Sequence, residues 1–307
     1  MGETRGVRWA LTHVRSLAEA GMSTPQQRRE LRRGYEFQLL SKLTPTIEVR
    51  SRGVRYLVNT DDQAVGRTVY VDGGFDEHYM AKAVQIVETR RGTPLSGTTM
   101  LDIGANIGTS TLLALSRHNF GAVIAFEPDP INFGLLTLNT IANGFADRTT
   151  LHQLGLSNQA GSMLMSRSPA NHGDRRLRTD FESDTASLYG EESWEAETVE
   201  VETLDSFEVD YDVVGCVWMD VQGHESHVLE GAQGLLASDV PIVTEYSPHL
   251  LDQVGALDRF HSLLAEEFAT VIDIRADCEY PGAQAGERLA SVYPPTTREF
   301  TDLALFH

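Results

Sequence analysis

The sequence predicts an α/β fold, in which helices cover both faces of a doubly wound, mostly parallel sheet. From residue 96 onward, short apolar runs typical of buried strands alternate with helical patterns. One such run, Met100–Ile103, leads into a glycine turn and then into a helix that begins at Thr109. We therefore expect a main domain over 96–307, preceded by an N-terminal extension of helices and short strands over 1–95.

The N-terminal extension begins with two helical patterns. Residues 5–20 place apolar side chains on one helical face, and a second pattern follows Pro25, a residue that suits the first turn of a helix. The second pattern contains the arginines 28, 29, 32 and 33. We expect this arm to be a lid over substrate or a homodimer contact, unless the charges simply form a solvated helix face. Three further patterns follow, with short strands at 46–57 and 67–72 and a helix over 76–90.

The main domain continues the alternation to its end. Strands are predicted at 122–126, 149–156, 161–165, 197–204, 213–219, 240–244, 270–274 and 302–306, and helices at 130–143, 226–237 and 257–268. A polar stretch, 166–196, separates two of these strands. It is long for a structureless loop in a compact domain, so we expect a mobile lid or a disordered insertion.

Composition and charge limit the function classes. The net charge is −19, and residues 1–57 hold 11 Lys/Arg and 5 Asp/Glu, which leaves a balance of −25 on the rest of the chain. Such an acidic body repels phosphate backbones, so nucleic acid is not the expected partner. No apolar run approaches the length of a membrane span, and no secretory signal is evident. The two cysteines, Cys216 and Cys278, lack metal-ligand spacing, and a cytoplasmic location is expected.

The glycine turn predicts a nucleoside pocket at the carboxyl edge of the sheet. Gly104 and Gly108 let backbone approach a ligand closely, and the free N–H groups of the following helical turn would face it. Glu127 ends the next strand, about 20 residues further on, where an acid can accept hydrogen bonds from both hydroxyls of a ribose. The alternative is a tight strand-to-helix turn that binds nothing.

The pattern differs from that of dinucleotide-binding proteins. Asn106 stands where their fingerprint has its middle glycine, and Asp102 would be badly placed beside a pyrophosphate. A carboxylate there suits a positively charged ligand, such as the ammonium and sulfonium groups of S-adenosylmethionine. A nicotinamide-dependent oxidoreductase is therefore the less favoured alternative.

Taken together, several segments resemble the FkbM-family methyltransferases, which are class I S-adenosylmethionine-dependent O-methyltransferases. The similar segments are LDIGANIGTSTLLAL, AFEPDPINFGLLTLN, LHQLGLSNQAGS, VETLD, MDVQGHESHVLEGAQGLL and PIVTEYSP. They span about residues 98–250, roughly half of the chain. The family often has Glu in D-V-E-G, where this chain has Gln222.

The resemblance implies a fold and a set of cofactor contacts. It implies a seven-stranded, Rossmann-like sheet whose last strand is antiparallel, a strand that the tail FTDLALFH can supply. It also implies that Gly104, Asn106 and Gly108 line the cofactor, that Glu127 holds the ribose, and that Leu156-Ser157 lie near the adenine. Asp102 and Asp220 complete the predicted cofactor contacts.

Three residues after the fourth parallel strand are candidates for chemistry. Transfer of a methyl group to an alcohol needs alignment and removal of a proton. Asp220 ends the strand and His224 and Glu225 follow, so either His224 takes the proton with Asp220 orienting it, or Asp220 takes it directly. Asp220 capping the next helix, and Glu225 merely meeting the helix dipole, are the alternatives. No His/Cys ligand spacing supports a metal site.

The sequence therefore predicts an S-adenosylmethionine-dependent O-methyltransferase. We expect the acceptor to be a hydroxyl, or a carboxyl, of a small molecule in natural-product tailoring or sugar methylation. A non-catalytic nucleoside-binding protein is the other alternative.

Overall fold

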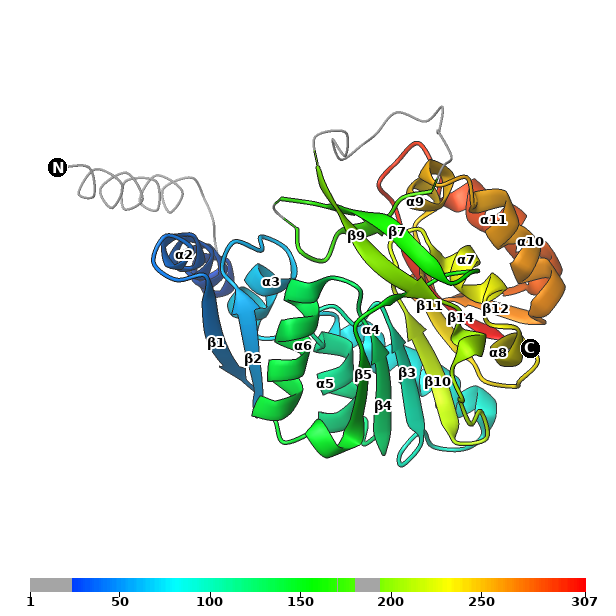
Figure 1. The fold of residues 1–307 in the computed structure, drawn as a ribbon, viewed down its shortest axis with the longest axis horizontal. Coiled ribbons are helices and arrows are strands. Elements are labelled where there is room, and N and C mark those ends of the chain that lie inside the picture. Colours follow the sequence, from blue (N-terminus) through cyan, green and yellow to red (C-terminus); the bar gives the residue numbers. More distant parts are fainter. Residues whose placement is uncertain (1–23, 170, 180–193) are drawn as a thin grey trace. The chain divides into compact units, whose positions relative to one another are not determined.

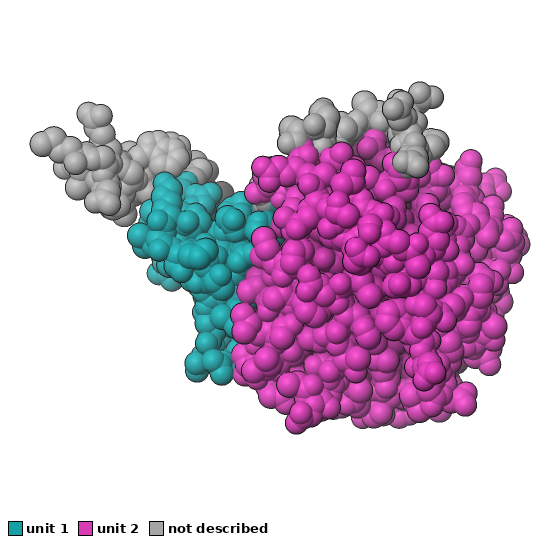
Figure 2. All heavy atoms as spheres, viewed as in Figure 1, with its two compact units in different colours: residues 1–75, 170–172 teal, residues 76–169, 173–307 magenta. Residues whose placement is uncertain are grey.

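The computed structural model describes residues 24–169, 171–179 and 194–307, which form two compact units (Figure 2). The first unit comprises the chain up to Phe75 together with residues 170–172. The second comprises 76–169 and 173–307, so its boundary lies ahead of the predicted one at 95/96. The predicted helix over 5–20 lies outside the described residues.

The described part of the first unit contains two helices and a two-stranded sheet. Its elements are α2 (Pro25–Leu40), β1 (Thr46–Ser51), β2 (Val54–Asn59) and α3 (Val65–Asp72). Helix α2 begins as predicted, because Pro25 occupies its first turn and the Thr24 side chain accepts the N–H of Gln27. Strands β1 and β2 form an antiparallel hairpin across Arg52-Gly53, both of which have positive φ.

The prediction of a strand at 67–72 is wrong, because these residues lie in helix α3. Val65 and Val69 are buried at helical spacing, and the Asp62 carboxylate accepts the N–H groups of Ala64 and Gly66 at the start of the helix. The alternation of apolar and polar residues there is too short to distinguish the period of a strand from that of a helix. The hydrogen bonds that Asp62 accepts favour the helix.

The main sheet of the second unit has the predicted doubly wound topology (Figure 1). Its strand order in the described residues is β13-β12-β14-β11-β10-β3-β4-β5. The strands are β3 (Thr99–Ile103), β4 (Ala122–Phe126), β5 (Thr149–His152), β10 (Val214–Met219), β11 (Ile242–Tyr246), β12 (Thr270–Asp273), β13 (Cys278–Pro281) and β14 (Thr301–Phe306). The tail strand β14 runs antiparallel between β11 and β12, as predicted, and β13 adds an eighth strand at the edge.

Two apolar layers cover the sheet, one on each face. Successive residues of β3 alternate between them: Met100 packs in one cluster and Leu101 in the other. The Met100 layer includes side chains of α4 (Glu77–Arg91), α5 (Thr109–Ser116) and α6 (Pro130–Ala142). The Leu101 layer includes side chains of α7 (Glu225–Glu230), α8 (Gln233–Leu236), α10 (Leu257–Glu267) and α11 (Gly282–Val292). Helix α9 (Pro248–Gln253) follows β11.

A second sheet interrupts the series of parallel strands. It has the order β6-β9-β7-β8 and consists of β6 (Gly155–Leu156), β7 (Gly161–Arg167), β8 (Arg175–Leu177) and β9 (Glu195–Glu202). The single strand predicted at 149–156 is thus two strands, because Gly155 pairs with Val201 of β9 instead of continuing the main sheet. The described part of the 166–196 insertion includes β8, and its remainder lies outside the described residues.

The helix predicted over 226–237 is broken into α7 and α8 at Gly231. A Cβ at Gly231 would lie 2.0 Å from the carbonyl oxygen of Ser157, so only glycine allows the chain to pass there. In the part of the chain that the structure describes, no helix has the length and apolarity needed to cross a bilayer.

Candidate active site

The turn after β3 is held by the end of the neighbouring strand. The N–H groups of Gly104 and Ala105 both donate to the carbonyl oxygen of Phe126, at 3.0 Å each. Gly104, Asn106 and Gly108 all have positive φ, of 84°, 53° and 87°. Since this region of φ is costly for residues with a Cβ, the two glycines relieve strain in the turn.

Each of the two glycines also makes room for a neighbouring element. A Cβ at Gly104 would lie 1.9 Å from the backbone oxygen of Asp220, and one at Gly108 would lie 2.7 Å from Cδ1 of Leu136. The N–H of Asp220 donates to Ile103 at 2.9 Å, so the ends of β3 and β10 meet closely. The predicted residues Gly104 and Asp220 therefore lie together at the carboxyl edge of the sheet.

Glu127 joins the turn to the end of β4. Its carboxylate accepts the backbone N–H of Asn106 and that of Asp129, each at 2.8 Å, and the residue is 4% exposed. Burial raises the pKa of this carboxyl group to about 8, against the lowering effect of the two backbone donors. Each carboxylate oxygen can accept more than one hydrogen bond, so capacity for a ligand's hydroxyl groups remains.

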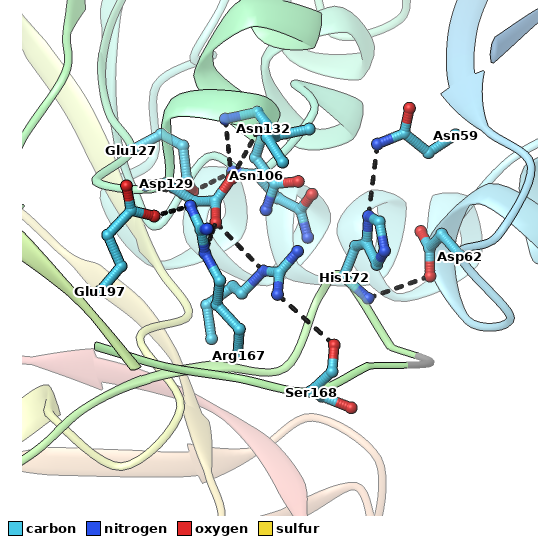
Figure 3. A network of polar contacts seen from close by, with 12 residues as sticks. Asn59, Asp62, Asn106, Glu127, Asp129, Asn132, Arg167, Ser168, His172 and Glu197 are labelled. Atoms are coloured by element: carbon cyan, nitrogen blue, oxygen red, sulfur yellow. Dashed lines mark hydrogen bonds and ion pairs between the residues drawn. The ribbon is translucent and has the colours of Figure 1, made fainter. Parts of the chain in front are cut away.

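A buried polar network surrounds Asp129, beside Glu127 (Figure 3). Asp129 accepts the N–H groups of Ile131 and Asn132 at the start of α6, and its other oxygen lies 3.0 Å from Nε of Arg167 and 3.3 Å from Nε of Arg175. Arg167 pairs with Glu197 as well. Because Arg167 and Arg175 belong to β7 and β8, the network fixes the second sheet to the loop that carries Glu127. These two arginines were not among the predicted site residues.

Asp102, on β3, is fully buried and half satisfied. Its Oδ2 accepts the hydroxyl groups of Ser110 at 2.7 Å and of Thr111 at 2.5 Å, at the start of α5. Its Oδ1 has no hydrogen-bond partner among the described residues. Burial raises the pKa of the Asp102 carboxyl group to about 6. A buried acceptor without a partner is costly, and a cationic or N–H-bearing ligand would satisfy it.

The predicted catalytic residue Asp220 belongs to a pair of bridged carboxylates. Gln222 donates its side-chain amide to Oδ1 of Asp220 at 2.7 Å and to Oε2 of Glu245 at 3.0 Å. Glu245 lies on β11, the strand next to β10. Burial raises the pKa of Asp220 to about 6, and burial together with the charge of Asp220 raises that of Glu245 well above its ordinary value.

Glu225 supports the backbone of the same loop. One oxygen accepts the N–H groups of Val221 at 3.3 Å and of Gly223 at 3.2 Å, and the residue is buried. Burial raises the pKa of this carboxyl group to about 7. These contacts give Glu225 a role in shaping the Asp220 loop.

The structure shows no contact between His224 and Asp220, the predicted pair, among the described residues. His224 is 1% exposed, its Nε2 lies 2.9 Å from Oγ of Ser157, and its other ring nitrogen has no partner among the described residues. Its ring stacks on that of His227, with centroids 4.3 Å apart. Burial lowers the pKa of His224 to about 3, which makes it a poor base. The His224 imidazole is buried because the start of α7 packs against the second sheet at Ser157. No local sequence pattern predicts this contact.

The predicted adenine neighbours, Leu156 and Ser157, are both 2% exposed. Leu156 lies in β6, and the N–H of Ser157 donates to Glu202 at 2.8 Å. The structure thus places them beside α7 and His224. Among the described residues, no group of three or more His, Cys, Asp or Glu side chains is arranged to hold a metal ion.

The strand order, with antiparallel β14 between β11 and β12 and an acid following the strand after the glycine turn, defines a class I methyltransferase fold. The family model described as the methyltransferase FkbM domain matches residues 102–281. The chain therefore belongs to the FkbM methyltransferase family.

Two curated relatives are similar in sequence to part of this chain. The hexuronic acid methyltransferase AglP of Haloferax volcanii is 30% identical over 146 residues, 47% of this chain and 54% of that protein. The 31-O-demethyl-FK506 methyltransferase FkbM of Streptomyces tacrolimicus is 29% identical over 211 residues, 60% of this chain and 77% of that protein. The match therefore spans only about half the length of AglP.

A solved structure, the methyltransferase FkbM of Methylobacillus flagellatus, aligns at 18% identity with a TM-score of 0.39. That alignment covers 90% of this chain and 59% of the other.

Proposed function

We propose that this chain is an S-adenosylmethionine-dependent O-methyltransferase that acts on a hydroxyl group of a small molecule. The observation that carries the proposal is the junction of the glycine turn with Glu127 and Asp220 at the carboxyl edge of three adjacent strands. Membership of the FkbM family supports a methyltransferase. The chemistry of the residues at this junction supports S-adenosylmethionine as the methyl donor.

The residues present fit S-adenosylmethionine. Glu127 retains acceptor capacity for ribose hydroxyls, and the unpartnered Oδ1 of Asp102 suits a positively charged group. Gly104, Asn106 and Gly108 shape the turn between these two acids. When bound, the donor would supply a methyl carbon activated by its sulfonium, with the neutral thioether as the leaving group.

The chain's own contribution to the reaction is the removal of the acceptor's proton. Asp220 is half-buried, ends β10, and has a pKa raised to about 6, which makes it a stronger base than an ordinary aspartate. His224 is enclosed by the core and lacks contact with Asp220 among the described residues. We therefore assign the proton to Asp220, with Glu225 shaping its loop.

The charge at this edge favours a hydroxyl over a carboxylate as the acceptor. Asp220, Glu245 and Asp302 interact repulsively there, and the Arg275 guanidinium acts in the opposite sense on Glu245. A carboxylate acceptor would add another negative charge. The relatives include a 2-O-methyltransferase, NoeI of Sinorhizobium fredii, 29% identical over 157 residues, and the FK506 enzyme; both names denote transfer to oxygen.

Titration calorimetry with S-adenosylmethionine, its demethylated product and NAD⁺ tests the proposal. We expect binding of the first two and none of NAD⁺. Turnover is then sought with a panel of glycosides, macrolides and uronic acids, followed by mass spectrometry for a gain of one methyl group. Binding of NAD⁺ alone would favour the oxidoreductase, and donor binding without turnover across the panel would favour a nucleoside-binding protein.

A further inference from the structure

The side chain of Gln222 lies between the carboxylates of two adjacent strand ends. A single amide nitrogen, Nε2, donates to Asp220 at 2.7 Å and to Glu245 at 3.0 Å. An amide NH₂ has two hydrogens, so each can be directed to one carboxylate. A carboxylate at position 222 would offer no such donors when ionised.

The backbone is held in an unfavourable conformation to make this contact. Gln222 has φ +54°, a region that long side chains rarely occupy, and Gly223 follows with φ +98°. A Cβ at Gly223 would lie 2.8 Å from the backbone of Leu250, so a side chain cannot be accommodated at this position without a shift. Glu225 fixes the same turn by accepting two of its N–H groups. Strain retained by surrounding contacts is typical of functional loops.

The surrounding charges make the bridge necessary. Asp302 on β14, Asp76 before α4, Asp174 before β8 and Glu225 all act on the pair, and they favour its protonation. The opposing cation is Arg275, whose Nε is 2.7 Å from Asp302 and whose guanidinium lies over the rings of Tyr79 and Phe300. Without a donor between them, two ionised carboxylates at adjacent strand ends would repel each other.

We propose that Gln222 is a positioning residue, whose amide holds the Asp220 and Glu245 carboxylates side by side and keeps Asp220 ionised to accept a proton. This inference rests on the proposed function for its catalytic consequence. In that step the acceptor's O–H bond breaks and its proton forms an O–H bond with an Asp220 carboxylate oxygen. Glu245 keeps the amide's second hydrogen occupied, which orients the first toward Asp220.

The test uses two variants and a matched control. Gln222→Met keeps the length of the side chain but removes both donors, and Gln222→Glu keeps its shape but replaces the donor by a third carboxyl group. Gln85→Met, at an exposed position of α4, controls for the substitution itself. The melting temperature of each protein is measured from pH 5 to pH 9, without donor or acceptor.

We expect both Gln222 variants to melt at a lower temperature than the parent, and this deficit in melting temperature should grow with pH. At pH 5 the carboxyl groups can hold protons and bond to each other, whereas at pH 9 the unbridged charges repel. A melting-temperature deficit at least about 2 °C larger at pH 9 than at pH 5 corresponds to roughly 1 kcal/mol for a chain of this size. Gln85→Met should follow the parent throughout. Deficits that are equal at every pH would show that Gln222 only fills space, and would overturn the proposal.

A second readout uses the acceptor that supports turnover. The acidic limb of the kcat/KM profile should move up by at least about one pH unit in Gln222→Met, while donor affinity stays within about threefold of the parent. An unshifted limb would overturn the proposal. Because the melting measurement needs no ligand, failure of the parent to bind a methyl donor would refute the proposed function and leave the bridge tested independently.

Discussion

At the scale of single residues, the site is a set of buried acids whose protonation is controlled by their surroundings. Asp220 carries the proton in the proposed reaction, and its pKa is raised to about 6 by burial. The kcat/KM of the parent enzyme should therefore fall as the pH is lowered through about 6, since protonated Asp220 cannot act as a base. A pH–rate profile checks this. A rate that is level from pH 5 to pH 8 would instead fit His224, whose pKa is lowered to about 3.

Glu127 is the residue on which donor affinity should depend most. Glu127→Ala removes the acceptor of two backbone N–H groups and of the proposed ribose hydroxyls. We expect it to weaken donor binding by roughly 1.5–3 kcal/mol. Calorimetry measures the loss, and Glu287→Ala, at an exposed site of α11, is the control. Parental affinity in the Glu127 variant would remove this carboxylate from the donor site.

At the scale of elements, the close contact between the ends of β3 and β10 determines whether the site forms. Gly104 and Gly97 share a φ of +84°, but a Cβ at Gly104 meets the Asp220 carbonyl oxygen whereas one at Gly97 meets nothing within 4 Å. Gly97→Ala should cost about 1–2 kcal/mol for its left-handed backbone. Gly104→Ala should cost at least about 2 kcal/mol more, because two backbones must separate. Urea unfolding compares the two, and equal losses would refute the close-contact explanation.

The elements show what local patterns can and cannot predict. Buried strands such as Ala122–Phe126 were predicted because they are short continuous apolar runs, and the helix predicted over 76–90 is observed as Glu77–Arg91. Segment 67–72 was assigned wrongly because a stretch so short fits both periods. The contact of Ser157 with His224 joins residues 67 positions apart, and such pairings depend on how the layers pack.

The candidate site was predictable to the same degree. The glycine turn, Glu127 and Asp220 each follow a strand, so their meeting at one edge follows from parallel topology. The arginines at positions 167 and 175 contact Asp129. They lie on strands of the second sheet, which was not predicted as a separate sheet. The bridging contacts of Gln222 could not be predicted, because they depend on how the ends of two strands lie relative to each other.

At the scale of the whole molecule, the buried acids should make stability fall as pH rises. Asp102, Glu225 and Glu127 have pKa values raised by burial to about 6, 7 and 8. Between the unfolded pKa near 4 and these values, the folded state holds more protons than the unfolded state, so raising the pH favours unfolding. Each group contributes a loss of about 1.4 kcal/mol per pH unit within its window.

Urea unfolding at pH 5, 6, 7 and 8 measures this dependence. We expect the free energy of unfolding to decrease from pH 7 to pH 8, because buried histidines of lowered pKa, such as His224, oppose the trend only below about pH 6.5. Glu127→Gln should reduce this slope because that position can no longer take up a proton. Stability that increases from pH 7 to pH 8 would contradict the raised pKa values.

The position of β14 has a consequence for how the protein is made. A nascent chain that has reached residue 300 already contains β11 and β12 but lacks the strand that separates them. Their facing edges then carry unpaired N–H and C=O groups, which are templates for pairing with another chain. The sheet cannot close until residues 301–306 have left the ribosome. Until then the facing edges of β11 and β12 stay open to pairing with another chain. Deletion of this strand would open two edges inside the sheet rather than shorten its rim.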